Sequence, residues 1–420
     1  MKKNVYAIAL AFLGLGSFSA QAQDQRMAKT DPALITPGRT CATMEVLEAQ
    51  MAADPSLAQR MAKVEQQTAE VLSSPATANR IGAVVTIPVV VHVLYNTTAQ
   101  NVSDAMITAQ LDVLNKDFSK TNTDAGLVPT MFAGLAANTN VQFVLAKRTP
   151  TGAATTGIVR KQTKVSSWST NDAVKSSKRG GDDAWDATKY LNLWVCNLGQ
   201  GLLGYAQFPG GSPATDGVVV LYSSLPGGTA KPYDKGRTAT HEVGHWLNLR
   251  HIWGDASCGN DLVSDTPTQQ TANYGCPAFP HVTCNNQGDM SMNYMDYTDD
   301  ACMYMFSTGQ ASRMNALFAS GGARAGLVTS QGGVAPRMTA TAAEVAMYPN
   351  PASNVLNLSL PATKAGKGWT VTVYDLRGHE MKQATYNGQG QVQVAQLPKG
   401  LYQMTVSDGQ QTLRQRFEKQ

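Results

Sequence analysis

Three of the six histidines in the chain lie in one short segment, HEVGHWLNLRH, which runs from His241 to His251. Residues four apart lie on the same face of an α-helix, so His241 and His245 can direct their imidazoles toward one metal ion. Glu242 would lie on a neighbouring part of that face, where its carboxylate could reach a water at the metal. Zinc binds imidazole nitrogen readily, and catalytic zinc sites combine three protein ligands with a water. The pattern is therefore typical of the zinc-binding helix of a metalloprotease.

The third ligand is expected from His251, six residues after His245. A straight helix cannot bring residues six apart to the same ion, so the helix must end and the chain must turn between them. Asn248 lies at this turn. Asparagine is the non-glycine residue that best tolerates a positive φ, so the sequence is compatible with such a turn.

The composition is that of a globular, exported protein without a nucleic-acid partner. The chain has 420 residues, enough for two or three domains. Hydrophobic residues make up 43% and charged residues 15%, and the net charge is only +4. Because the 34 basic and 30 acidic residues nearly balance and no long basic run occurs, we expect no nucleic-acid binding.

The first residues, MKKNVYAIALAFLGLGSFSAQAQDQ, have the three parts of a secretory signal peptide. Lys2 and Lys3 supply positive charge, Val5–Phe18 is the apolar part, and Ala20–Ala22 is a small-residue cleavage site. We expect residues 1–22 to be removed. A membrane anchor is the alternative, but the apolar run is too short for it and no later segment would span a bilayer, so the mature protein is expected to have no transmembrane segment.

Export would place the cysteines in an oxidising compartment. Four of them follow closely after the histidines: Cys258, Cys276, Cys284 and Cys302. Four cysteines allow three pairings. A structural zinc cluster is the alternative, but the spacings lack a C-x-x-C pair, so disulfides are favoured. Cys41 and Cys196 stand apart from this group.

Apolar patterns predict strands and one long helix before the zinc-binding segment. The expected strands are residues 84–96, 140–150, 190–199, 202–211 and 216–226, and the expected helix is 104–121. His92 lies inside the first strand and is expected to be a core residue. The strand at 216–226 could provide the sheet edge along which a substrate lies. The order of elements indicates an α+β fold whose active-site helix backs a twisted sheet.

The two ends of the chain differ from this middle part. Residues 30–80 are helix-prone, with Met44, Leu47 and Met51 on one stripe, and they end in a linker of small and polar residues. Past Gly332 a loose linker is followed by short alternating strands at 355–360, 369–376, 391–397 and 401–409. Short strands separated by Gly- and Pro-containing turns predict a small all-β sandwich domain.

The middle of the chain resembles the pappalysin (cytophagalysin) family of metzincin zinc metalloproteases. The resemblance rests on HEVGHWLNLRHIWGD and MNYMDYTDDACMYMF, with a weaker match in YLNLWVCNLGQGLLGYAQFPGG, and together these cover most of residues 81–325. The family pattern HExxHxxGxxH has glycine where this chain has Asn248. Since asparagine can make the same turn, the departure is compatible with activity.

The resemblance implies roles for individual residues. The three histidines would bind zinc, and Glu242 would act as general base and then as general acid. Met295 would form the tight turn beneath the metal, a position where methionine also fills space in the core. Tyr297 would line the cleft and hydrogen-bond the tetrahedral intermediate.

The same resemblance implies the loop structure around the cleft. The cysteines would pair as Cys258–Cys284 and Cys276–Cys302, and Asp300 would lie in the S1′ pocket and favour arginine in the substrate. Calcium binding is implied in the loop after the third histidine, where Asp261 and Asp265 are candidate ligands. Solvated loop carboxylates are the alternative interpretation of these two residues.

An Arg-x-Cys segment before the catalytic part resembles the one in the family's propeptides. It predicts that Cys41 binds zinc in a latent form, against the alternatives that Cys41 pairs with Cys196 or is an idle thiol. A thiolate is a good zinc ligand. Cleavage near Arg80 would then end the latency, and an arginine-preferring enzyme could make this cut itself.

The C-terminal part resembles the type IX secretion sorting domain, through YPNPASN, DLRGHE, LPKGLY and a last strand with Arg414 and Arg416. The resemblances imply a propeptide at 23–80, a metzincin catalytic domain at 81–330 and a linker at 331–346. Residues 347–420 would form the sorting domain. The protein would cross the outer membrane through the type IX machinery and be secreted or remain at the cell surface.

These features predict a secreted zinc metalloendopeptidase that hydrolyses extracellular proteins or peptides, prefers arginine and is made as a latent zymogen. One alternative is a catalytically silent, zinc-containing surface binding protein, which the presence of Glu242 and Tyr297 argues against. The other is a zinc amidase acting on cell-wall peptides. An endopeptidase needs an open groove with an edge strand, so the length of the cleft distinguishes this second alternative.

Overall fold

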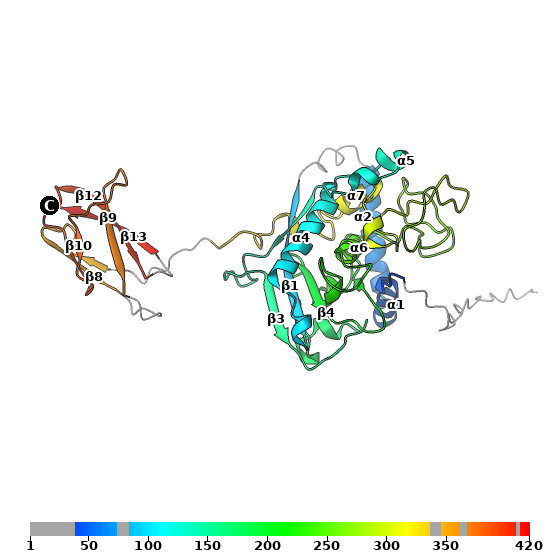
Figure 1. Ribbon diagram of the computed structural model, residues 1–420, viewed down its shortest axis with the longest axis horizontal. Helices are drawn as coiled ribbons and strands as arrows, with labels where there is room; N and C mark the ends of the chain where they lie inside the picture. The colour runs from blue at the N-terminus through cyan, green and yellow to red at the C-terminus, as the bar shows by residue number, and fades with distance from the viewer. Residues whose placement is uncertain (1–37, 74–83, 337–345, 361–367, 409–411) are drawn as a thin grey trace, which may run out of the picture. The chain divides into compact units, whose positions relative to one another are not determined.

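The computed structural model describes residues 38–73, 84–336, 346–360, 368–408 and 412–420 (Figure 1). The predicted signal peptide at residues 1–22 and the predicted cleavage site near Arg80 lie outside these ranges. Within the described ranges, no helix combines the length and the apolar character needed to cross a membrane.

Residues 39–73, called the N-terminal segment below, form two helices, as the sequence predicts. They are α1 (Thr43–Ala53) and α2 (Leu57–Ser73). Helix α1 ends before Pro55, because the residue that precedes a proline is disfavoured in the α conformation. The stripe of Met44, Leu47 and Met51 is confirmed: these side chains belong to one apolar cluster that also contains Phe208.

A mixed six-stranded sheet follows. Its strands are β1 (Val85–Tyr95), β2 (Val141–Leu145), β3 (Ile158–Gln162), β4 (Leu191–Cys196), β5 (Gly204–Ala206) and β6 (Val218–Leu221). The order is β2-β1-β4-β6-β5, and β3 pairs with β1 beyond the end of β2. All pairs are parallel except β5 with β6. The sequence pattern does not predict β3, because its residues IVRKQ are half-buried or exposed and only partly apolar.

The edge of the sheet differs from the expectation. Residues 216–226 contain β6, which lies between β4 and β5 and is therefore an inner strand. The edge is β5, only three residues long. The run Val218–Val220 is completely buried, and a continuous apolar run of this kind is typical of an inner strand that is covered on both faces.

Helices cover one face of the sheet. They are α4 (Asp104–Ser119), α5 (Thr130–Ala133), α6 (Arg237–Trp246), α7 (Thr308–Ala316) and α8 (Ala325–Val328). Because side chains alternate along a strand, Val89, Val91 and Val93 of β1 face the main core with α4 and α6, whereas Leu94 belongs to a second cluster. Figure 1 shows α4 and α6 beside the strands. This arrangement confirms the predicted α+β fold with an active-site helix on a twisted sheet.

The C-terminal part forms two antiparallel sheets, as expected for a small sandwich. One has the order β10-β11-β8-β7 and the other β13-β12-β9. The strands are β7 (Ala346–Tyr348), β8 (Val355–Ser359), β9 (Thr370–Tyr374), β10 (Thr385–Tyr386), β11 (Gln391–Gln393), β12 (Gly400–Ser407) and β13 (Thr412–Lys419). Leu356, Val392, Met404 and Phe417 lie in one core cluster, so residues from both sheets share a common interior.

Candidate active site

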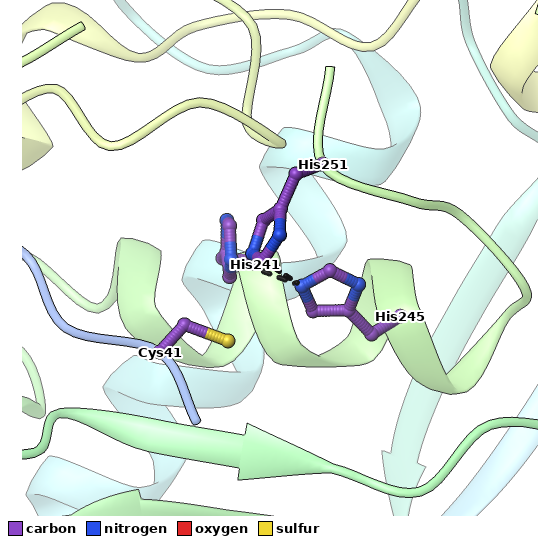
Figure 2. Close-up of side chains that lie close together, drawn as sticks. All are labelled: Cys41, His241, His245 and His251. Atoms are coloured by element: carbon purple, nitrogen blue, oxygen red, sulfur yellow. Dashed lines mark hydrogen bonds between the residues drawn. The ribbon is translucent and has the colours of Figure 1, made fainter. Parts of the chain in front are cut away.

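The zinc-binding sequence folds as the spacing predicts. His241 and His245 lie one turn apart on α6, which ends at Trp246. Asn248 then adopts a left-handed conformation with φ of 70°, and the chain returns to bring His251 to the same point. The Nε2 atom of His245 lies 3.1 Å from the Nε2 atoms of both His241 and His251 (Figure 2).

The opposite ring nitrogens are held by acceptors. Nδ1 of His241 lies 2.7 Å from the carbonyl oxygen of Tyr294, and Nδ1 of His245 lies 2.8 Å from that of Leu249. Nδ1 of His251 contacts the carboxylate of Asp255. Such partners fix the tautomer that leaves Nε2 available to a metal. Burial also holds the pKa values of His241 and His245 well below their usual range, which keeps both imidazoles neutral.

Asp255 was not found from the sequence, although it lies only four residues after His251. Its contact with His251 depends on a left-handed backbone conformation in a loop, with φ of 56°, which no local sequence pattern predicts. The structure thus adds an acidic partner to the third histidine. A carboxylate that accepts from the far nitrogen of a metal-binding histidine raises the basicity of that ligand.

Cys41 of the N-terminal segment joins the histidines. Its Sγ and one nitrogen from each of His241, His245 and His251 all lie within 4.8 Å of one another, and all four residues are buried (Figure 2). Three imidazoles and one sulfur form a donor set that suits a tetrahedral zinc ion. The residues present therefore fit zinc, and in the described ranges this is the one group of three or more such side chains that could hold a metal.

The backbone around Cys41 is attached to the edge strand. The N–H of Ala42 donates to the carbonyl oxygen of Gly204 at 3.1 Å, and the N–H of Leu203 donates to that of Thr40 at 3.0 Å. Cys41 and Gly204 form a parallel bridge. An exposed strand edge can add an extended peptide in this way, and here the N-terminal segment occupies that edge.

Glu242 lies beside the histidine cluster and is 1% exposed. Its Oε2 accepts a hydrogen bond of 2.9 Å from the hydroxyl of Thr43 and lies 3.5 Å from Sγ of Cys41. Burial raises the pKa of Glu242 to about 8, although Thr43 and Cys41 oppose the shift. Gly204 is required opposite it, because a Cβ there would lie 2.8 Å from Cγ of Glu242.

Met295 and Tyr297 both lie close to the histidine cluster. A Cβ atom on Gly244 of α6 would lie 2.4 Å from Sδ of Met295, so this methionine packs directly against the active-site helix. The hydroxyl of Tyr297 donates to the carbonyl oxygen of Cys41 at 3.3 Å, and its ring lies 4.9 Å from that of His251. Tyr297 therefore reaches the chain that occupies the cleft.

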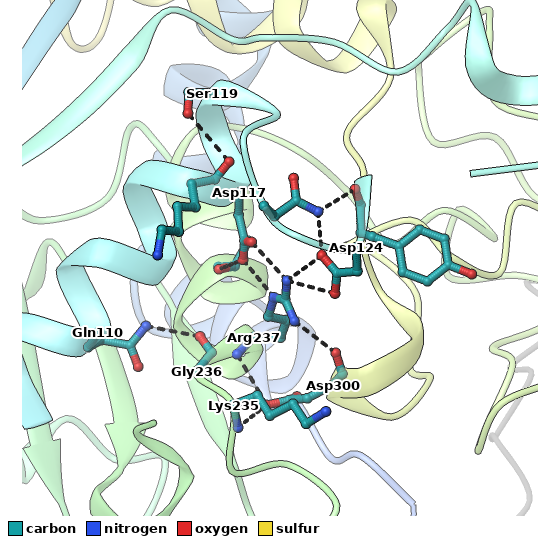
Figure 3. Close-up of polar contacts among 12 residues, drawn as sticks. Gln110, Asp117, Ser119, Asp124, Lys235, Gly236, Arg237 and Asp300 are labelled. Carbon is teal, nitrogen blue, oxygen red and sulfur yellow. Dashed lines mark hydrogen bonds and ion pairs between the residues drawn. The ribbon is translucent and has the colours of Figure 1, made fainter. Parts of the chain in front are cut away.

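Asp300 is completely buried and bound by donors on two sides. Its Oδ2 accepts from the backbone N–H groups of Lys235 and Arg237, at 2.8 and 3.2 Å, at the start of α6 (Figure 3). Its Oδ1 pairs with the guanidinium of Arg39 at 2.5 Å. Asp299, the neighbouring carboxylate, is only partly buried and has no ion pair of this kind among the described contacts. Arg39 lies 261 residues away along the chain, so sequence reasoning did not find the pair.

Arg237 holds the backbone of Asp300 in place through its guanidinium. Its guanidinium pairs with Asp117 at 2.9 Å and with Asp124 at 3.1 Å, and it also donates to the carbonyl oxygen of Asp300 at 3.1 Å (Figure 3). Asp117 comes from α4. The start of α6 is thus fixed by buried ions, which sets the place of Asp300 relative to the histidines.

Disulfides shape the loop that follows the third histidine. The structure contains Cys258–Cys284 and Cys276–Cys302, the two pairs that the resemblance implies. Cys196 is a free cysteine buried in the second cluster, and burial raises the pKa of its thiol. Cys41 is also free of a disulfide, so the alternative of a Cys41–Cys196 bond is wrong in this structure.

Asp261 and Asp265 do not converge on a common point with a third acidic ligand. Asp261 accepts hydrogen bonds from Thr266 and from the N–H of Val263. Asp265 accepts from Ser307 and from the N–H of Gly309, and so caps α7. These contacts account for both carboxylates without an ion, and calcium binding there stays a prediction.

His92 is a core residue as expected: its Nδ1 lies 2.7 Å from Asp182, and it is completely buried.

Comparisons with known proteins agree with this geometry. Residues 175–319 match the model of the pregnancy-associated plasma protein-A peptidase family, and residues 346–420 match that of the secretion system C-terminal sorting domain. An extracellular metalloprotease of Pyricularia oryzae is 32% identical over 337 residues, which cover 76% of this chain and 98% of that protein. One of Arthroderma benhamiae is 34% identical over 256 residues, which cover 57% and 74%.

Two solved structures from Tannerella forsythia are similar as well. A promirolysin mutant is 47% identical with a TM-score of 0.64, and the match covers 69% of this chain and 97% of that one. Mature mirolysin in complex with a cleaved peptide is 51% identical with a TM-score of 0.58, over 59% and 97%. With its histidine cluster and its sorting domain, the chain belongs to the pregnancy-associated plasma protein-A (pappalysin) family as a secreted zinc metalloprotease.

Proposed function

We propose that this secreted metalloprotease is made as a latent precursor and cleaves peptide bonds on the N-terminal side of arginine. One observation carries the proposal. Arg39 pairs with buried Asp300, and Cys41, two residues later, reaches the histidine cluster. An arginine and a metal-binding group are thus held along one stretch of chain that is attached to the edge strand β5.

The latency follows from the position of Cys41. A catalytic zinc ion of this type needs a fourth position open for water. With Cys41 beside the three histidines, its sulfur would take that position. The hydroxyl of Thr43 engages Oε2 of Glu242 at the same time, so the carboxylate is also occupied by the N-terminal segment.

The arginine preference follows from the surroundings of Asp300. One of its oxygens is satisfied by the start of α6, and the other is directed to Arg39, which also lies over the ring of Tyr233 at 4.9 Å. A buried carboxylate beside an aromatic ring suits a guanidinium better than a neutral side chain. Once Arg39 leaves, the same position can accept an arginine that follows the scissile bond.

The remaining residues have roles that agree with hydrolysis. A zinc ion bound by the three histidines supplies Lewis-acid activation of water and of the scissile carbonyl. In its charged form Glu242 can accept the proton from the attacking water and deliver it to the leaving amine. Tyr297, which donates to the carbonyl oxygen of Cys41 in the precursor, can donate to the substrate oxygen that becomes negative.

Maturation would separate the N-terminal segment from the catalytic part. We assign residues 1–22 to the signal peptide, 23–80 to the propeptide and 81–330 to the catalytic domain. Residues 331–346 would form the linker, and 347–420 the sorting domain. Family membership as a metalloprotease argues against a silent binding protein. Backbone pairing along β5 favours an endopeptidase over an amidase for small cell-wall peptides, because it accepts an extended polypeptide.

The test is the cleavage profile of the activated enzyme on a peptide library. Wild-type enzyme should cut before arginine, and Asp300→Asn should flatten that preference while it retains zinc. Asp299→Asn is the matched control and should leave the profile unchanged. An arginine preference that persists in Asp300→Asn would contradict the proposal.

A further inference from the structure

Glu65 of helix α2 is bound by two donors of the catalytic part. The side-chain amide of Asn248 donates to its Oε1 at 3.1 Å, and the guanidinium of Arg313 pairs with the same oxygen at 2.5 Å. Asn248 is the residue at which this chain departs from the glycine of HExxHxxGxxH. A glycine could not supply this donor. The pair Asn248 and Arg313 is called the carboxylate site below.

The backbone of Asn248 and the guanidinium of Arg313 also have partners other than Glu65. The N–H of Asn248 donates to the carbonyl oxygen of His245 at 2.8 Å, and Nε of Arg313 donates to the carbonyl oxygen of Asn248 at 2.8 Å. The side chain of Arg313 is 4% exposed, whereas that of Glu65 is 29% exposed. The carboxylate site therefore belongs to the catalytic part, whereas Glu65 belongs to the segment that the proposed maturation would remove.

Removal of the N-terminal segment would take away the acceptor that the guanidinium of Arg313 and the amide of Asn248 share. Asp261 is close enough for the charge of Arg313 to act on it, but its own hydrogen bonds go to Thr266 and to the N–H of Val263. A charged acceptor binds such donors more strongly than a neutral one does. The vacated site would therefore favour another carboxylate.

The carboxylate site and Asp300 lie near opposite ends of α6. Asp300 contacts the start of α6, whereas Asn248 follows its C-terminal end. Phe208, just beyond the edge strand, has its ring 5.5 Å from that of His245 and is covered by apolar side chains of the N-terminal segment. If the residue after the scissile bond faces Asp300, the residues before that bond run along β5 toward Phe208 and Asn248.

We propose that Asn248 and Arg313 form a subsite for an acidic side chain of the substrate, on the N-terminal side of the scissile bond, which Glu65 fills in the precursor. This inference takes the direction of the substrate from the arginine preference proposed above. The enzyme would then select polypeptides with a glutamate or aspartate several residues before an arginine. The two charges on the substrate match Arg313 and Asp300 at the two ends of α6.

The experiment compares pairs of peptides that differ only in whether one side chain is glutamate or glutamine. Enzyme obtained by activation of the full-length chain is given peptides with arginine after the scissile bond and glutamate at one of the second to sixth positions before it. A matched set carries glutamine at the same positions. We expect kcat/KM to favour glutamate about tenfold at one position, as for a hydrogen-bonded charge.

Asn248→Asp is the test variant, because aspartate also tolerates a positive φ and keeps the size of the side chain while it removes the amide donor. In this variant the ratio of glutamate to glutamine substrates should fall to one or below, and Lys116→Gln, an exposed cation on α4, should leave it unchanged. A wild-type ratio near one at every position, or a ratio that persists in Asn248→Asp, would overturn the subsite. If the peptide-library profile of the wild type shows no arginine preference while the glutamate ratio is intact, the proposed function is contradicted and the subsite stands.

Discussion

The hydroxyl of Thr43 donates a hydrogen bond of 2.9 Å to Oε2 of Glu242. The same hydroxyl accepts from the N–H of Ala206 in the edge strand at 2.9 Å. Thr43 therefore connects the N-terminal segment, the edge strand β5 and the carboxylate next to the histidines. Since Cys41 lies only two residues before it, one short stretch of chain contacts both the metal ligands and the proposed general base.

Glu242→Ala should slow peptide hydrolysis by several orders of magnitude without loss of zinc. Removal of a general base lowers the rate by about 10²–10⁴-fold, because no other group in the described site can take the proton from water. The measurements are casein hydrolysis and zinc content by mass spectrometry. The full-length variant should also accumulate uncut if the enzyme matures itself. Hydrolysis at the wild-type rate would refute the role of Glu242.

Cys41→Ala should release the precursor from latency, because the sulfur beside the histidines is gone. Cys196→Ala is the matched control, since Cys196 is likewise a buried free cysteine but lies in the second cluster. We expect the Cys41 variant to mature earlier on a gel time course, and the Cys196 variant to mature with the wild-type protein. Equal maturation of all three proteins would show that Cys41 does not restrain the enzyme.

Much of the site could be predicted because its residues are close in sequence. The spacing of His241, His245 and His251 allows one metal position, and Asn248 tolerates the turn that they require. The inner strands are also visible as runs of apolar residues. The strands at 202–211 and 216–226 were both predicted, but the edge was assigned to the wrong one, since edge and inner positions are decided by the neighbours that a strand finds.

The contacts of the N-terminal segment could not be predicted in the same way. Arg39 and Asp300 lie 261 residues apart, and Thr43 and Glu242 lie 199 apart. Such pairs depend on the route of the chain across the cleft, and a local pattern does not contain that route. Glu65 and Arg313 are a further case, with 248 residues between them.

Removal of residues 347–420 should leave a folded and active protease. The two C-terminal sheets have their own core, with Leu356, Met404 and Phe417, and they contribute none of the residues of the site. The truncated protein should hydrolyse casein at the wild-type rate after purification. In its native host it should remain in the periplasm, because the sorting domain is missing. Loss of activity in the purified protein would mean that this domain is part of the catalytic unit.

The stability should depend on pH through Asp261. Burial raises the pKa of this carboxyl group to about 6, so the folded state keeps the proton at pH values at which the unfolded chain has lost it. The resulting stabilisation is complete below pH 4 and is lost as the pH rises through 6. Asp261→Asn stays neutral and keeps an acceptor for Val263. The free energy of unfolding of this variant should therefore rise relative to that of the wild type as the pH increases from 4 to 7.5, by up to about 3 kcal/mol.

The measurement is the free energy of unfolding of both proteins in guanidinium chloride across this pH range, with a calcium chelator present. Parallel curves for the two proteins would refute the pKa shift of Asp261. Addition of calcium tests the alternative in which Asp261 is a calcium ligand. If Asp261 binds calcium, the wild type should gain stability from the ion and the variant should not.

Zinc K-edge X-ray absorption of the precursor tests the central claim most directly. The arrangement of Cys41 with the three histidines predicts a first shell of three nitrogens and one sulfur, with the sulfur at about 2.3 Å. The matured enzyme and the Cys41→Ala precursor should lack the sulfur and have a light atom in its place. A wild-type precursor without a sulfur shell would contradict the account.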